Sequence, residues 1–175
     1  SEMCIRDSLG DLENDDCPID AYWADDARID ERETAQIEAA EIAEVRTMSH
    51  WSGLYFGGTA FKKQRIVDPN HYVEAAVHAS EWLDVITTSG ISTGKAADVE
   101  KIRKFREGAK DFALAVASGI TPENVNCYRS DIDAILVSTG INRNDDFYNI
   151  DRVKLSRLMQ NCRTSISEND GETNS

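Results

Sequence analysis

Small hydroxyl residues and glycines follow two apolar runs near the carboxyl end of the sequence. Ser118 and Gly119 follow the first run, and Ser138, Thr139 and Gly140 follow the second. An apolar run without alternation predicts a strand buried on both faces, and a glycine after it lets backbone amides approach a ligand closely. Amides and hydroxyls bind phosphate oxygens, so we predict a phosphate-binding site here. The alternative is that the small residues only let the strand ends turn tightly.

A third apolar run leads into a similar segment. Ser89, Thr93 and Gly94 lie in the stretch that follows this run. They are candidates to bind a ligand hydroxyl or a phosphate oxygen. A plain serine-threonine turn is the alternative.

Lys62 is the candidate for a catalytic cation, because we predict it at the carboxyl end of a strand. A buried lysine with a lowered pKa can act as a base or form a Schiff base. Lys63 comes next in the sequence and is expected to face the opposite side of that strand. The alternative is a solvated loop over the charged segment that continues to Arg65.

Asp25 is the candidate acid, in a polar loop that follows the first predicted strand. Asp25 and Asp26 together have the chemistry to bind a divalent cation or to act as acid and base. The alternative is a polar loop in which Asp30 caps the next helix.

These candidates require a frame of strands and helices that alternate along the chain. The predicted strands cover residues 18–23, 52–61, 83–88, 112–117 and 134–138. The predicted helices cover residues 31–46, a segment that starts at 68–69, residues 96–107, a short segment that starts near 121, and residues 151–162. Such alternation predicts a parallel sheet with right-handed crossovers. Glycines at nearly every strand end favour a TIM barrel over a doubly wound sheet.

The composition excludes several classes of protein. The 175 residues carry a formal net charge of −13, which argues against nucleic acid as a partner. No apolar run is long enough to span a membrane. The sequence has no CxxC pair, no HExxH and no Walker loop, so we expect no metal and no resident cofactor. Four scattered cysteines fit a cytoplasmic protein.

Four segments resemble the BtpA/SgcQ family, which is named for a photosystem I biogenesis protein. They are Thr87-Thr-Ser-Gly-Ile-Ser-Thr-Gly94, Ala117-Ser-Gly-Ile-Thr-Pro-Glu-Asn-Val125, Ile135-Leu-Val-Ser-Thr-Gly140 and Ile150-Asp-Arg-Val153. The resemblance implies an α/β fold, a TIM barrel of the ribulose-phosphate-binding type, of which this chain covers strands four to eight. The family often has Asp and His where this chain has Gly58 and Lys63, whereas Lys62 keeps the family's lysine.

The resemblance implies a phosphorylated small molecule as ligand and names no reaction. It also implies an alternative, which is a non-catalytic accessory factor for photosystem I biogenesis that associates peripherally with a membrane. By this resemblance, residues 17–163 form the carboxyl-terminal part of a barrel, and residues 9–16 are either a disordered segment or a remnant loop. Residues 1–8 resemble the translation of a sequencing adaptor, and residues 164–175 are predicted to be a disordered tail.

Overall fold

The structure is a computed structural model that describes residues 19–92, 94–144, 146 and 148–163. The candidate Thr93 lies outside the described residues. The predicted segments 1–8, 9–16 and 164–175 lie outside them too.

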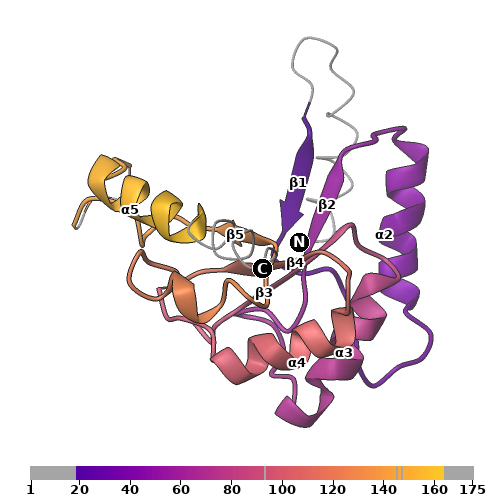
Figure 1. Cartoon of the computed structure of the whole chain (residues 1–175). Helices are drawn as coiled ribbons and strands as arrows, with labels where there is room; N and C mark the ends of the chain where they lie inside the picture. The colour runs from indigo at the N-terminus through magenta and orange to yellow at the C-terminus, as the bar shows by residue number, and fades with distance from the viewer. Residues whose placement is uncertain (1–18, 93, 145, 147, 164–175) are drawn as a thin grey trace, which may run out of the picture.

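Five parallel strands form a single sheet in the order in which they follow along the chain. They are β1 (Ala21–Ala24), β2 (Leu54–Gly58), β3 (Val85–Ser89), β4 (Leu114–Ala117) and β5 (Ala134–Leu136). The strands alternate with helices, and the sheet curls into a half-barrel (Figure 1). The predicted partial TIM-barrel fold is therefore confirmed.

Helices connect the strands and cover one face of the sheet (Figure 1). They are α2 (Ile37–Met48), α3 (Tyr72–Ser80), α4 (Val99–Ala109) and α5 (Arg152–Arg163), with single 3₁₀ turns at Pro69–His71 and Val125–Cys127. The predicted helix start at Asp68 is confirmed, because the Asp68 side chain accepts a hydrogen bond from Asn70 N. None of the helices in the described ranges has both the length and the apolar character needed to cross a bilayer.

Two helix predictions were wrong. The helix predicted from residue 31 begins only at Ile37, so Asp30 does not cap it. The helix predicted near Thr121 is a turn followed by the 3₁₀ turn Val125–Cys127, so no extended helix points its amino terminus at the rim there.

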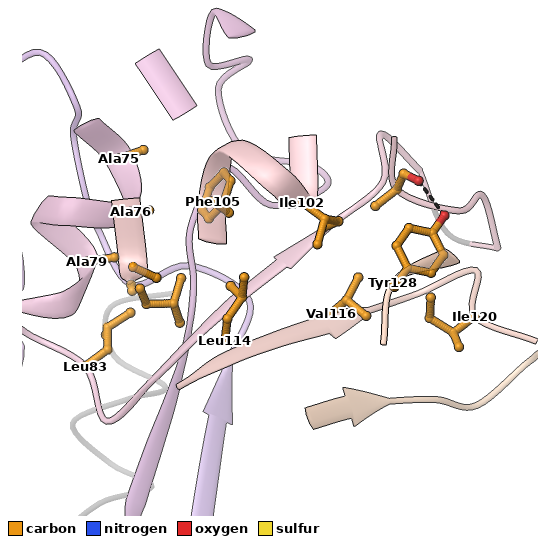
Figure 2. Packing of buried hydrophobic residues seen from close by; sticks show 14 of the residues in the cluster. Ala75, Ala76, Ala79, Leu83, Ile102, Phe105, Leu114, Val116, Ile120 and Tyr128 are labelled. Atoms are coloured by element: carbon orange, nitrogen blue, oxygen red, sulfur yellow. Dashed lines mark hydrogen bonds between the residues drawn. The ribbon is translucent and has the colours of Figure 1, made fainter. Parts of the chain in front are cut away.

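The main core lies between the sheet and the pair α3 and α4 (Figure 2). Alternate residues of β4, Leu114 and Val116, pack toward Ile102 and Phe105 of α4. A run of buried alanines on α3 leaves little side-chain bulk between the two helices. Gly108 of α4 completes this contact, because a Cβ there would overlap the backbone of Val73.

Candidate functional site

The carboxyl ends of the five strands meet at one rim, as they must in a parallel sheet. The loops after β1, β2, β3, β4 and β5 carry the predicted site residues, and each of these loops contacts the next along the rim. The rim is the part of the structure in which the sequence places all of its candidate chemistry.

The loops after β3 and β4 are packed directly against each other. Gly94 N donates to Ser118 Oγ at 3.1 Å. Gly119 has a φ of +71°, and a Cβ there would overlap the backbone of Lys95 and Ala96. Ser118 and Gly119 therefore have a structural role in joining two loops, whether or not a ligand binds.

The loop after β5 packs on the loop after β4 in the same manner. A Cβ on Gly140 would overlap the carbonyl oxygen of Ile120. The hydroxyl residues Ser138 and Thr139 are exposed at this point of the rim. In the part of the chain that the structure describes, the backbone amides of Thr139 and Gly140 donate to no protein acceptor. The loop after β5 therefore carries two exposed hydroxyl residues next to two backbone amides that have no acceptor among the described residues.

An arginine lies close in sequence to these groups. Arg143 follows Gly140 in the same loop, and its side chain is exposed. Its backbone N donates to Asn149 O at 3.0 Å, which holds the loop after β5 against the segment that leads to α5. This loop therefore offers a cation as well as neutral donors.

Ser89 is buried at the end of β3, and its hydroxyl is already engaged. Ser89 Oγ donates to Gly90 O at 2.9 Å and accepts from Lys62 N at 2.9 Å. The geometry thus assigns Ser89 to joining β3 to the loop after β2, while its predicted role as a ligand group stays a prediction. Gly94, by contrast, is exposed, and no atom lies within 4 Å of where a Cβ would be.

Lys62 lies on the rim but outside the strand. β2 ends at Gly58, so the prediction that Lys62 and Lys63 lie on opposite faces of a strand was wrong. Lys62 is in a turn, half-buried, with Nζ 5.5 Å from the ring centroid of Phe61. Lys63 is exposed and has a φ of 68°.

Asp25 directly follows β1 and is exposed on the same rim. Its carbonyl oxygen accepts from Gln64 Nε2 at 2.7 Å, which ties the loop after β1 to the loop after β2. Asp26 is engaged locally, because its Oδ1 accepts from Arg28 N at 2.9 Å. Asp25 is therefore the acid of this pair whose carboxylate has no hydrogen bond or ion pair among the residues that the structure describes. Within the described residues no group of three or more His, Cys, Asp and Glu is placed to hold a metal ion.

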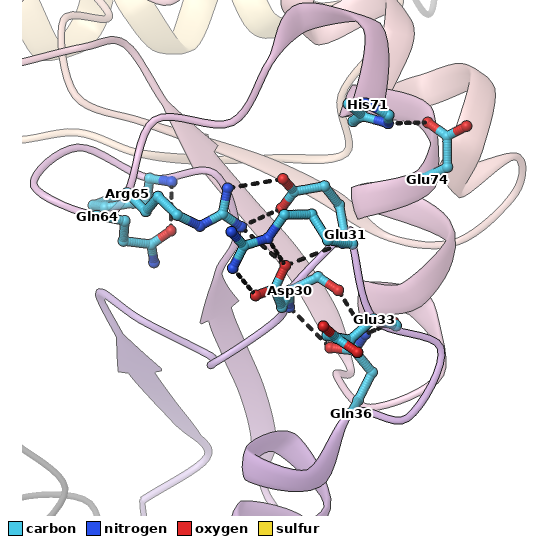
Figure 3. A network of polar contacts seen from close by, with 10 residues as sticks. Asp30, Glu31, Glu33, Gln36, Gln64, Arg65, His71 and Glu74 are labelled. Atoms are coloured by element: carbon cyan, nitrogen blue, oxygen red, sulfur yellow. Dashed lines mark hydrogen bonds and ion pairs between the residues drawn. The ribbon is translucent and has the colours of Figure 1, made fainter.

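A network of charged side chains, which the sequence analysis missed, braces the loops after β1 and β2 (Figure 3). The Arg65 guanidinium donates to both carboxylate oxygens of Glu31, at 2.8 and 2.5 Å, and to Asp30 Oδ1 at 3.1 Å. The Glu31 side chain is only 3% exposed. Hydrogen bonding from Arg65 lowers the pKa of Glu31 below its ordinary value. Gln36 closes the loop by donating to the carbonyl oxygens of Asp30 and Glu33.

Lys101 is another residue whose contacts the sequence analysis did not predict. It lies on α4, and its Nζ donates to Ala60 O at 2.6 Å and to Ser89 O at 2.8 Å, at the carboxyl ends of β2 and β3. Burial lowers its pKa to about 8. The sequence holds one signal for it, because Lys101 precedes the buried Phe105 by four residues and so shares its helix face.

Comparison with known proteins gives the family. The sequence model of the BtpA family matches residues 60–164, a stretch that begins just after β2 and contains the loops after β3, β4 and β5. A search of curated proteins finds no match. The match covers more than half of the 175 residues and includes Lys62 but not Asp25. The chain therefore belongs to the BtpA family.

Proposed function

We propose that the rim of this half-barrel binds a phosphorylated small molecule through the loops after β4 and β5. The observation that carries the proposal is that the exposed residues Ser138 and Thr139 lie next to backbone amides, those of Thr139 and Gly140, that have no acceptor among the described residues. Amides and hydroxyls of this kind bind phosphate oxygens without a metal ion. No reaction is assigned to the site.

Charge supports the same loop. The chain carries a formal net charge of −13, so a phosphate dianion is repelled by most of its surface. Arg143 is an exposed cation in the loop after β5, which also holds the acidic residues Asp145 and Asp146. Lys62 supplies a second cation farther along the rim, on the loop after β2.

The test is the melting temperature of the chain with inorganic phosphate and with a panel of sugar phosphates, each against sodium chloride of equal ionic strength. A ligand that binds only the folded state raises the melting temperature. Gly119 and Gly140 are unsuitable for substitution here, because their neighbours leave no space for a Cβ. The double substitution Ser138→Ala and Thr139→Val removes both hydroxyls and leaves the glycines in place.

We expect the phosphate-induced rise in melting temperature to fall in the double variant. Ser156→Ala, at an exposed position on α5, is the matched control and should keep the full rise. No rise with any phosphate in the unchanged chain would overturn the proposal. That result would favour the non-catalytic accessory role, which co-sedimentation with membranes would then test.

A further inference from the structure

The ammonium group of Lys101 is surrounded by aromatic rings and backbone carbonyls rather than by carboxylates. Its Nζ lies 5.3 Å from the ring centroid of Tyr72 and 5.7 Å from that of Phe105. Within the described residues it forms no ion pair with a carboxylate. The favourable contacts of the ammonium group are therefore two ring faces and two backbone carbonyls.

Lys101 is partly buried, and an ammonium group that loses hydration is costly compared with an apolar side chain of the same length. If Lys101 only filled the space between α3 and α4, a methionine would fill it without the loss of hydration. The feature that methionine lacks is the pair of hydrogen bonds to Ala60 O and Ser89 O. Ala60 lies in the loop after β2 and Ser89 is the last residue of β3, so a single ammonium group joins that loop to the neighbouring strand end.

The contact continues to Lys62. Ser89, whose carbonyl accepts from Lys101, also accepts from Lys62 N through its hydroxyl at 2.9 Å. Ala60 lies two residues before Lys62 in the same loop. Lys101 and Ser89 therefore hold this loop at two points, one on each side of Phe61.

We propose that Lys101 is a positioning residue of the rim, which holds the loop that carries Lys62 against the carboxyl end of β3. Its relevance to a ligand rests on the proposed function, but the placement of the loop can be tested without any ligand. Lys101 acts from the outer face of the sheet, so it does not contact a molecule bound on the rim.

The experiment measures amide hydrogen exchange by NMR for Lys62 in the loop and for Val116 in the core strand β4. In Lys101→Met we expect the Lys62 amide to exchange ~10-fold faster, while Val116 keeps its rate. Lys101→Arg keeps a cation with several donors and should restore part of the protection. The control is Lys104→Met, on the same helix, whose Nζ donates to Pro69 O at 3.1 Å and not to a strand end.

Two results would overturn the inference. One is unchanged exchange at Lys62 in folded Lys101→Met. The other is equal acceleration at Lys62 and Val116, which would mean that the substitution weakens the whole fold. A second readout is the melting-temperature rise with inorganic phosphate, expected to be smaller in Lys101→Met than in Lys104→Met. If the unchanged chain shows no rise, the proposed function fails, while the exchange result still decides the role of Lys101.

Discussion

Asp84 and Asp133 occupy equivalent positions in two parts of the half-barrel, the β2–β3 unit and the β4–β5 unit. Asp84 precedes β3 and its Oδ2 accepts from Tyr55 N of β2 at 2.7 Å. Asp133 precedes β5 and its Oδ2 accepts from Leu114 N of β4 at 2.9 Å. Each aspartate thus accepts a hydrogen bond from an amide near the amino-terminal end of the preceding strand, at the edge of the sheet opposite the rim.

An arginine completes each arrangement from the helix before that strand. Arg46 of α2 donates to Asp84 Oδ2 at 2.5 Å, and Arg106 of α4 donates to Asp133 Oδ2 at 2.6 Å. The structure therefore contains two copies of one unit. In each, an aspartate before one strand accepts hydrogen bonds from an arginine of a helix and from a backbone amide of the preceding strand.

We predict that Asp133→Ala lowers the free energy of unfolding by roughly 1–2 kcal/mol. The substitution removes the acceptor of Leu114 N and leaves Arg106 without its carboxylate partner. Urea unfolding would measure the change. Glu107→Ala, at an exposed position on α4, is the control and should stay within about 0.5 kcal/mol of the unchanged chain.

The Lys101 ammonium group predicts a dependence of stability on alkaline pH. Its folded pKa of about 8 lies below the ordinary value of 10.5, so between these values the unfolded chain keeps a proton that the folded chain has lost. Stability from this group therefore rises with pH, by at most about 1.4 kcal/mol per pH unit.

Between about pH 7.5 and 9.5, which lies around and above the folded pKa, we expect the free energy of unfolding of the unchanged chain to rise relative to that of Lys101→Met. Tyr72 packs against Lys101, but burial raises its pKa above the ordinary value of 10.0, so it does not titrate in this pH range. A difference that stays flat with pH would contradict the prediction.

Arg65→Met should be strongly destabilising at neutral pH, by about 2–4 kcal/mol, because it leaves the buried Glu31 carboxylate without its partner. The pKa of Glu31 is lowered in the folded chain, so the stability from this pair is present above pH 4.5 and is lost as pH falls through the folded pKa. The deficit of the variant should therefore shrink in acid. Arg103→Met removes an exposed pair with Glu100 and should have little effect at any pH.

Gly94 and Gly119 allow two effects of an added Cβ to be separated, namely strain of a backbone with positive φ and overlap with neighbouring atoms. Both have positive φ values, +78° and +71°. A Cβ at position 94 meets no atom within 4 Å, whereas at position 119 it overlaps the backbone of the loop after β3. We predict a loss of about 1 kcal/mol for Gly94→Ala and at least about 3 kcal/mol for Gly119→Ala, measured by thermal unfolding. Similar losses for the two variants would mean that the loops separate easily.

The sequence by itself determined the order of the five strands and of the four α-helices between and after them. Uninterrupted apolar runs such as the one that ends at Ala117 are readable because a strand covered on both faces needs apolar residues throughout. The Asp68-Pro69 helix start is readable because capping is local, within a few residues of the chain. The same locality placed the candidate site residues after strands, and hence on one rim.

Only the tertiary structure decided which groups contact one another across that rim. Residues 31–36 have helical propensity, yet Glu31 is drawn into a loop by Arg65, which lies 34 residues away along the chain. In the sequence, Lys101 is one of several charged residues of a predicted helix. Its proposed role depends on two carbonyl oxygens from other segments. Hydrogen bonds and ion pairs between segments far apart in sequence leave no local pattern, because their geometry is set by how strands and helices pack. The sequence therefore indicates where the candidate chemistry lies, and the packing decides which side chains are engaged and which face solvent.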